Sequence, residues 1–363
     1  MRAREGNREL PPDLSRVRRV LVLRHRAAGD LLLTTPALRA LRAGLPSARI
    51  DVLVSRGTGA ILSRNPDVDR VLELDRRSIL AQAAWYAKLT GLGYDLVLDM
   101  VSNPRSAFMT ALTRAKVRVG YDLPGRRYAY TIRLPREPAA LAPEGMRGRY
   151  APESSLDLVR ALGIPSRGLE LTFHVPPEAR ERTDAWLMEC GLGNRPLLAC
   201  LPSGTWPTKT WIPERFAAVM DALHDVGDVL WLWGPGEEPL AMECRALMVN
   251  PSTMAPPTAW PDLAALVQRC ALLVSNDSGP KHLAVALGVP TVTIFGPTNP
   301  VAWQPRTGPH AAVEAVGLDC LHCNQTRCPL PGDRYMRCMR DVSVAMVVGA
   351  SRARLVEKAG SAA

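Results

Sequence analysis

Residues 20–44 read VLVLRHRAAGDLLLTTPALRALRAG, and this stretch decides the fold class. Its first four residues are Val and Leu, as expected of a strand buried on both faces of a parallel sheet. Residues 24–30 form a polar loop, and the leucine spacing of residues 31–43 predicts an amphipathic helix that Gly44 and Pro46 end. A strand, a glycine-containing loop and a helix in this order are typical of a βαβ unit.

The alternation of strand and helix continues on both sides of a proline-rich segment at residues 122–152, which we interpret as a loop and linker region. Runs typical of buried strands fall at residues 50–54, 71–74, 95–99, 196–201, 229–233, 272–274 and 291–295. Helices are predicted at residues 78–90, 213–224, 263–270, 281–287 and 342–358. This pattern predicts two doubly wound α/β domains with a ligand site where they face each other.

Composition narrows the class of protein. The 363 residues suffice for two domains at ~150 residues each, and a hydrophobic content of 47% excludes an intrinsically disordered protein. No stretch approaches the ~18 consecutive apolar residues of a membrane helix. The net charge of +10 favours an anionic partner. A nucleic-acid-binding protein is therefore one alternative, although aromatic residues are only 5% and no helix-turn-helix, zinc-finger or RRM motif is present.

The amino-terminal residues 1–18 are rich in arginine and predict a flexible basic extension. The apolar run after them has only four residues, fewer than the ~7–15 of a secretory signal, so a cytoplasmic protein is expected. Only five of the 45 basic residues are lysine, and two of the five, Lys209 and Lys281, lie in the loops described next.

Three polar loops follow predicted strands. The first contains Gly29 and Asp30, and the Asp30 carboxylate suits either a helix N-cap or a general base. The second reads PSGTWPTKT at residues 202–210, where backbone N–H groups, hydroxyls and a lysine suit a phosphate. The third reads NDSGPKH at residues 276–282 and opens a helix, which suits an anion at the helix N-terminus. An ordinary loop and simple helix capping are the alternatives for these two.

The order of residues in these loops argues against several nucleotide-binding motifs. The first loop lacks the GxGxxG spacing of a dinucleotide-binding dehydrogenase, and the second lacks the GxxxxGK[ST] order of a P-loop. None of the three loops contains a DxD-type metal motif.

Together with FGPT at residues 295–298, these loops resemble glycosyltransferase family 9, the ADP-heptose:lipopolysaccharide heptosyltransferase family. The resemblance extends over about residues 19–355. It implies a GT-B fold, in which two Rossmann-like domains face each other and a C-terminal helix crosses back to the first. The expected acceptor domain is residues 19–155 with a helix at about 342–360, and the expected nucleotide-sugar donor domain is residues 156–341.

The resemblance also implies a role for each matching residue. Asp30 matches the proposed catalytic base of the family, and Lys209 matches a lysine that interacts with the donor phosphates. An acidic residue that contacts the nucleotide matches Glu237 or Glu238. The other donor-binding residues expected on this basis are Ser203, Gly204, Thr205, Asp277, Ser278, Gly279, Lys281 and His282.

The implied reaction is an inverting transfer of a sugar, with heptose from ADP-heptose favoured, to a lipopolysaccharide core or related glycan. No catalytic cofactor or metal is expected, because helix N-termini and lysine replace Mg²⁺ at the leaving group. The expected partners are a nucleotide-sugar donor and a glycolipid or glycan acceptor, with peripheral contact to the inner membrane and no nucleic acid. The alternatives are another nucleotide-sugar enzyme of this fold, such as an epimerase, and a non-catalytic Rossmann-like binding module.

Four of the eight cysteines are clustered near the carboxyl end, separated by two, four and nine residues: Cys320, Cys323, Cys328 and Cys338. This spacing suits a structural zinc ion or an iron–sulfur cluster, and free or disulfide-paired thiols are the alternative. The other four lie among apolar residues and are predicted to be buried thiols: Cys190, Cys200, Cys244 and Cys270.

Overall fold

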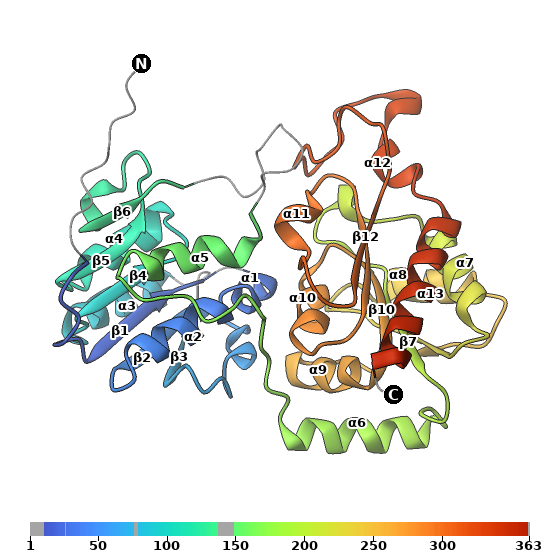
Figure 1. Cartoon of the computed structure of the whole chain (residues 1–363), viewed down its shortest axis with the longest axis horizontal. Helices are drawn as coiled ribbons and strands as arrows, with labels where there is room; N and C mark the ends of the chain where they lie inside the picture. The colour runs from blue at the N-terminus through green and yellow to red at the C-terminus, as the bar shows by residue number, and fades with distance from the viewer. Residues whose placement is uncertain (1–10, 26, 76–78, 137–148, 362–363) are drawn as a thin grey trace.

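The structure, a computed structural model, describes residues 11–25, 27–75, 79–136 and 149–361. It contains two domains, each built on a six-stranded parallel sheet with helices against it. Figure 1 shows the first domain in blue to green, through α5, and the second domain from light green at α6 to red at α13. The predicted α/β class with two doubly wound domains is confirmed.

The first sheet is formed by β1 (Arg19–Leu23), β2 (Arg49–Ser55), β3 (Arg70–Leu74), β4 (Leu96–Asp99), β5 (Val117–Tyr121) and β6 (Ile132–Leu134). Its helices are α1 (Ala28–Leu32), α2 (Thr35–Gly44), α3 (Ile79–Gly91), α4 (Pro104–Leu112) and α5 (Ala151–Arg160), with short 3₁₀ turns η1 (Gly59–Ile61) and η2 (Arg127–Ala129).

The second sheet is formed by β7 (Leu197–Leu201), β8 (Asp228–Trp231), β9 (Thr253–Met254), β10 (Cys270–Asn276), β11 (Thr291–Phe295) and β12 (His310–Glu314). Its helices are α6 (Pro177–Glu189), α7 (Pro213–Leu223), α8 (Glu238–Ala246), α9 (Trp260–Arg269), α10 (Gly279–Ala286), α11 (Pro300–Trp303), α12 (Arg337–Arg340) and α13 (Val344–Ser361), with 3₁₀ turns η3 (Pro207–Lys209) and η4 (Gly332–Arg334).

The two sheets share one strand order. The first runs β3-β2-β1-β4-β5-β6, and the second runs β12-β11-β10-β7-β8-β9, which is the same order when its strands are counted from β7. In the first sheet, successive strands are therefore added to one side of β1 and then, from β4 onward, to the other side. The same reversal of strand order occurs between β7 and β10 in the second sheet. In open parallel sheets ligands bind at the carboxyl ends of the strands at such a switch point. The three loops singled out in the sequence follow β1, β7 and β10.

The helix predicted over residues 31–43 is two helices, α1 and α2. Pro36 has no N–H to donate to the carbonyl of Leu32, and the Thr35 hydroxyl donates to that carbonyl instead at 2.8 Å. The break ends α1 close behind Asp30, so the first loop and its carboxylate stay at the edge of the sheet.

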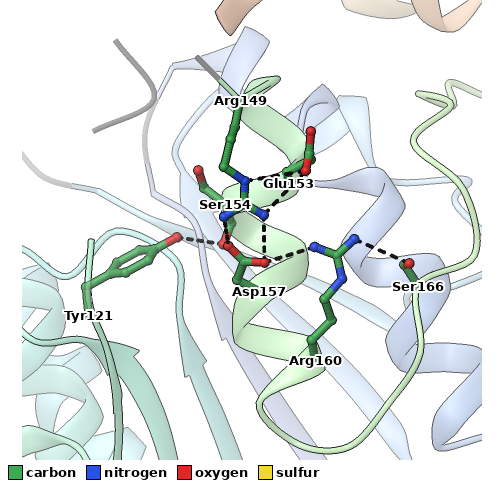
Figure 2. Close-up of polar contacts among 7 residues, drawn as sticks. All are labelled: Tyr121, Arg149, Glu153, Ser154, Asp157, Arg160 and Ser166. Atoms are coloured by element: carbon green, nitrogen blue, oxygen red, sulfur yellow. Dashed lines mark hydrogen bonds and ion pairs between the residues drawn. The ribbon is translucent and has the colours of Figure 1, made fainter. Parts of the chain in front are cut away.

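The boundary that we placed at residue 155 falls inside α5, which packs on α2 of the first domain. Figure 2 shows how α5 is held: Arg149 pairs with Asp157 at 2.5 Å and with Glu153 at 3.3 Å. The hydroxyl of Tyr121, at the end of β5, donates to the carbonyl of Ser154 at 2.8 Å. The first domain therefore extends through α5.

The C-terminal helix does not cross back to the first domain as expected. α13 packs on α7 and on the strands β10, β11 and β12 of the second sheet. Its buried residues Val347 and Ser351 face this domain, and Arg352 pairs with Asp225 at 2.9 Å beside the end of α7. Apolar burial therefore holds α13 on the domain that precedes it in sequence.

Two smaller predictions are also corrected. Residues 1–10 of the expected basic extension lie outside the described residues, but Val17 is buried in the core of the first domain, and the N–H of Arg18 donates to Asp95. Cys190 caps the end of α6 and is exposed, because the carboxyl end of that helix faces solvent. Burial is confirmed for Cys200, Cys244 and Cys270.

The domains touch where two glycines meet. α1 packs against α10, and a Cβ atom on Gly29 would lie 3.1 Å from the Cα of Gly279 and 3.1 Å from the His282 ring. Such contacts are tighter than most real Cβ contacts, so a side chain at residue 29 would hold the two helices apart. Glycine at this point lets the first loop approach the start of α10.

Candidate functional site

Asp30 lies on α1 at the carboxyl end of β1, on the side that faces the second domain. Its side chain is 18% exposed and accepts a hydrogen bond from Arg24 Nη2 at 3.2 Å. Arg24 in turn donates to the Met100 carbonyl at 2.7 Å, beyond the end of β4. The carboxylate is therefore oriented by a fixed guanidinium and remains accessible, as a general base needs. It makes no N-cap hydrogen bond at α1, whose N-cap is Ala27.

Opposite Asp30, the second and third loops are joined by one buried carboxylate. Asp277 accepts from Lys209 Nζ at 2.8 Å and lies 3.3 Å from Lys281 Nζ. The hydroxyl of Thr298 donates to the same carboxylate at 2.9 Å. Burial alone would raise the pKa of Asp277, but the ammonium groups of Lys281 and Lys209 hold it well below its usual range. The carboxylate is therefore ionised and neutralised by two lysines.

The two lysines are placed differently. The Lys281 side chain is completely buried, with its ammonium between Asp277 and the carbonyl of Trp303. Burial lowers the pKa of Lys281 to about 8, against the attraction of Asp277. The Lys209 side chain is 12% exposed, and its ammonium lies 4.6 Å from the Trp206 ring centroid. Of this pair, only Lys209 is open to a ligand.

The start of α10 carries polar groups without protein partners. The hydroxyl of Ser278, the N-cap residue, is buried and has no hydrogen-bond partner among the described residues. His282 is buried beside Trp303, with a ring-centroid distance of 6.2 Å, and its Nδ1 also lacks a partner in the described part of the chain. Burial, and next the charge of Lys281, keep the pKa of His282 well below its usual value, so the ring is neutral. A helix N-terminus with a spare hydroxyl suits an anion.

The remaining predicted donor-site residues surround the second loop. Ser203 donates to Glu237 Oε2 at 2.6 Å, and the N–H of Gly234 donates to the same oxygen at 2.9 Å. Glu238 is exposed at the start of α8, so Glu237 is the acidic residue that faces this loop. A Cβ on Gly204 would lie 3.1 Å from the Lys209 backbone, and Thr205 is exposed at the rim.

Three residues outside the predicted set hold these loops in place. Asn276 accepts from the N–H of Trp211 at 3.2 Å and donates to the carbonyl of Pro202 at 2.6 Å, which ties the second loop to the third. Thr298 orients Asp277 as described, and Arg24 orients Asp30. A buried Asn at the end of a strand was the available signal for Asn276, since such a side chain needs partners.

All eight cysteines are free thiols. The four clustered ones line one cavity of about 100 Å³ together with Thr208 and Pro297. No three His, Cys, Asp or Glu side chains of the described residues converge in a ready-made metal site. Burial, and next the nearby cysteines Cys323, Cys320 and Cys328, raise the pKa of Cys338 to about 11.

Comparisons with known proteins decide the family. Residues 83–332 match the model of glycosyltransferase family 9 (heptosyltransferase). The chain belongs to glycosyltransferase family 9. Lipopolysaccharide heptosyltransferase 3 of Escherichia coli is 30% identical over 288 residues, which is 76% of this chain and 83% of that protein.

Two solved structures of family members have the same fold. A family 9 glycosyltransferase from Veillonella parvula superposes with a TM-score of 0.82 at 22% identity, covering 96% of this chain and 99% of that one. The E. coli heptosyltransferase WaaC, solved with ADP-2-deoxy-2-fluoro heptose, gives 0.64 at 21% identity, covering 94% and 99%. The expected GT-B arrangement of two Rossmann-like domains is confirmed. No helix among the described residues is long and apolar enough to cross a bilayer.

Proposed function

We propose that this family 9 chain is an inverting glycosyltransferase that moves heptose from ADP-heptose to a lipopolysaccharide core acceptor. The observation that carries the proposal is the juxtaposition of Asp30, on the first domain, with the start of α10 on the second, through the contact of Gly29 with Gly279. One side offers a base and the other offers an anion site. A single displacement at an anomeric carbon needs both.

The donor site, in this proposal, is the second domain. The diphosphate lies at the N-terminus of α10, where the unpartnered Ser278 hydroxyl and the N–H groups of the first turn donate to it. Lys209 moves its ammonium from Asp277 to the leaving phosphate, over a short distance because its side chain is at the cleft surface. Glu237, held by Ser203 and by Gly234, accepts from the nucleoside.

Asp277 and Lys281 act as positioning residues rather than donor ligands. An ionised carboxylate beside a diphosphate would repel it unless its charge were balanced. The buried ammonium of Lys281 lies 3.3 Å from the Asp277 carboxylate and supplies that balance when Lys209 turns to the phosphate. Asp277 therefore holds Lys209 before the donor arrives and does not repel the diphosphate afterwards. His282, neutral and buried, packs between α10, on which it lies, and Gly29 of α1.

The first domain binds the acceptor and supplies the base. The acceptor hydroxyl gives its proton to Asp30 while its oxygen forms a bond to the anomeric carbon. The bond from that carbon to the diphosphate oxygen breaks, ADP leaves, and the configuration at the carbon inverts. Arg24 keeps the Asp30 carboxylate aimed into the cleft. Lys209 and the α10 N-terminus stabilise the leaving group, so the reaction proceeds without a catalytic metal.

The proposed acceptor is an anionic glycolipid, which agrees with the net charge of +10 and places the enzyme at the cytoplasmic face of the inner membrane. The experiment is a thermal-shift panel of ADP-, UDP- and GDP-sugars, followed by mass spectrometry of products with and without an acceptor. We expect ADP-heptose to stabilise the protein most and to be consumed only when the acceptor is present. Donor isomerised without any acceptor would instead identify an epimerase and overturn the proposal.

A further inference from the structure

The helices α3 and α4 cover one face of the first sheet. Their buried residues Leu89 and Met109 pack in one core with Leu21 of β1. The core on the opposite face of the sheet contains Leu38 of α2 and Leu156 of α5. α3 and α4 also pack on each other. Their inner sides are therefore used by the fold, and their outer sides are left at the surface.

These two outer sides carry few charges. α3 has 13 residues with one charged side chain, Lys88, and α4 has nine residues with one, Arg105. α6 of the second domain also has 13 residues, and six of them are charged. The exposed positions of α3 include Ala83, Ala84 and Ala87. A surface helix normally presents charged and polar side chains to water, so the outer side of α3 is apolar where α6 is polar.

Four aromatic side chains extend this apolar surface, and we call them the aromatic face: Trp85, Tyr86, Phe108 and Tyr128. The rings of Tyr86 and Phe108 meet edge to face at a centroid distance of 5.3 Å, and Phe108 is 45% exposed. The ammonium of Lys88 lies 5.0 Å from the ring centroid of Trp85. The turn η2, which packs on α4, adds Tyr128 at 59% exposed. Tyr and Trp, with an apolar body and a polar tip, are enriched where a membrane meets water.

The segment that carries the aromatic face is strongly basic. Residues 79–136 contain nine basic and three acidic side chains, a net charge of +6, against +10 for the whole chain. The three carboxylates are engaged within the protein. Asp99 is buried, Asp95 accepts from the backbone N–H of Arg18 at 2.8 Å, and Asp122 pairs with Arg127 at 2.5 Å. The exposed basic side chains on α3 and directly after α4 are Lys88, Arg114 and Lys116.

We propose that the aromatic face docks the protein on a bilayer of anionic phospholipids. The aromatic rings and the alanine side of α3 enter the boundary between headgroups and acyl chains, and the surrounding basic side chains pair with lipid phosphates. A positive surface alone would suit nucleic acid, and an apolar surface alone would suit another protein. The two occur together on α3, α4 and η2, which is the combination that an anionic bilayer attracts.

The position of the aromatic face suits an acceptor that is held in the membrane. The Met100 carbonyl, at the end of β4, accepts from Arg24 at 2.7 Å, and Arg24 orients Asp30. α4 begins four residues after Met100, and a capping box between Asn103 and Ser106 fixes its start. A docked α4 therefore holds the base at a set distance from the bilayer. This link rests on the proposed function, whereas the docking itself does not.

The test is flotation of the purified full-length chain with vesicles that contain neither glycolipid nor nucleotide sugar. The protein should float with vesicles of phosphatidylethanolamine and phosphatidylglycerol, far less with phosphatidylcholine alone, and added salt should release it because ions screen the attraction. Phe108→Asp should lower the partition coefficient on the anionic vesicles about tenfold or more. Lys88→Glu should lower it about fivefold or more. Met188→Asp, at a 77% exposed position of α6, and Arg180→Glu on the same helix are the matched controls and should float like the wild type.

A second readout separates lost docking from misfolding and from lost activity. Lys88 is exposed, so Lys88→Glu should keep the wild-type melting temperature and circular dichroism even where Phe108→Asp does not. Wild-type protein that stays unbound, that floats equally with phosphatidylcholine, or that floats equally as Lys88→Glu would overturn the proposal. So would a dimer or a nucleic-acid complex that forms through the aromatic face without vesicle binding. Transfer to a short water-soluble acceptor is measured separately, so its failure in a protein that floats would overturn the proposed function and leave the docking.

Discussion

Replacing Asp277 by Asn tests the charge balance on which the donor site depends. Asn keeps the shape of the side chain but removes the anion that faces Lys209 and Lys281. Lys281 is completely buried, so it would then hold an ammonium with no counter-ion inside the protein. Lys209 and Lys281 would also repel each other across the vacated charge.

The expected cost is large. Removing one partner of a buried ion pair costs about 3–5 kcal/mol of stability, because an uncompensated charge stays buried. A surface pair costs about 0–1 kcal/mol. Asp225→Asn, in the exposed pair with Arg352 at 2.9 Å, is therefore the matched control. At about 2–4 °C per kcal/mol for a domain of this size, Asp277→Asn should lower the melting temperature by about 6–20 °C.

The assay is thermal and urea unfolding of the wild type, of the single variants Asp277→Asn and Lys281→Met, and of the double variant. The double variant removes both buried charges, so it should regain much of the lost stability. The free energies of unfolding in urea give the coupling energy between Asp277 and Lys281, as the loss in the double variant minus the sum of the two single losses. A normal melting temperature in Asp277→Asn, or additive losses in the double variant, would refute the reasoning.

The same pair predicts a pH dependence. Lys281 has a pKa of about 8 in the folded chain, below its ordinary value of 10.5, because burial disfavours its charge. Between these two values the unfolded chain binds more protons, so this group makes stability rise with pH. In Asp277→Asn the folded pKa falls further, so the rise should begin at a lower pH. The cost of Asp277→Asn should therefore shrink in alkaline buffer, and a cost that grows there would contradict the assignment.

The remaining predictions concern the base, the interdomain contact and the loop tether. Asp30→Asn should lower kcat by about 10²–10⁴-fold, as for loss of a general base, while donor affinity by calorimetry stays unchanged. Gly29→Ala places a Cβ 3.1 Å from the Gly279 Cα and should cost about 1–3 kcal/mol in urea unfolding; an unchanged midpoint would count against a tight contact. Asn276→Ala leaves two buried backbone groups unpaired and should cost about 1–3 kcal/mol for each, measured the same way.

The sequence predicted the central strands and the site loops well, for a physical reason. The VLVL residues of β1 and the whole of β7 are buried on both faces, so they read as uninterrupted apolar runs. β5 (VRVGY) and β6 (IRL) lie toward the edge of the sheet, where half-exposed positions take arginine, and no strand was predicted there. The sequence pattern predicted the α13 helix but not the domain on which it packs, because that depends on burial against residues distant in sequence.

Within the site, residue types were predictable but their partners were not. Asp277 and Lys281 are only four residues apart, on either side of the N-cap Ser278, so their pairing had a local signal. That Lys281 points into the core and Lys209 into the cleft depends on how α10 is packed against β11 and the second loop, which is non-local. The same holds for Arg24, which reaches Asp30 across the turn between β1 and α1.

The most direct test of the central claim is the mass of a heptose-deficient lipopolysaccharide core acceptor after incubation with ADP-heptose. Wild-type protein should add one heptose residue and release one equivalent of ADP, with inverted configuration at the anomeric carbon. Asp30→Asn should bind ADP-heptose with normal affinity and leave the acceptor mass unchanged at the same time point. An unmodified acceptor with the wild type, or equal product from Asp30→Asn, would contradict the account.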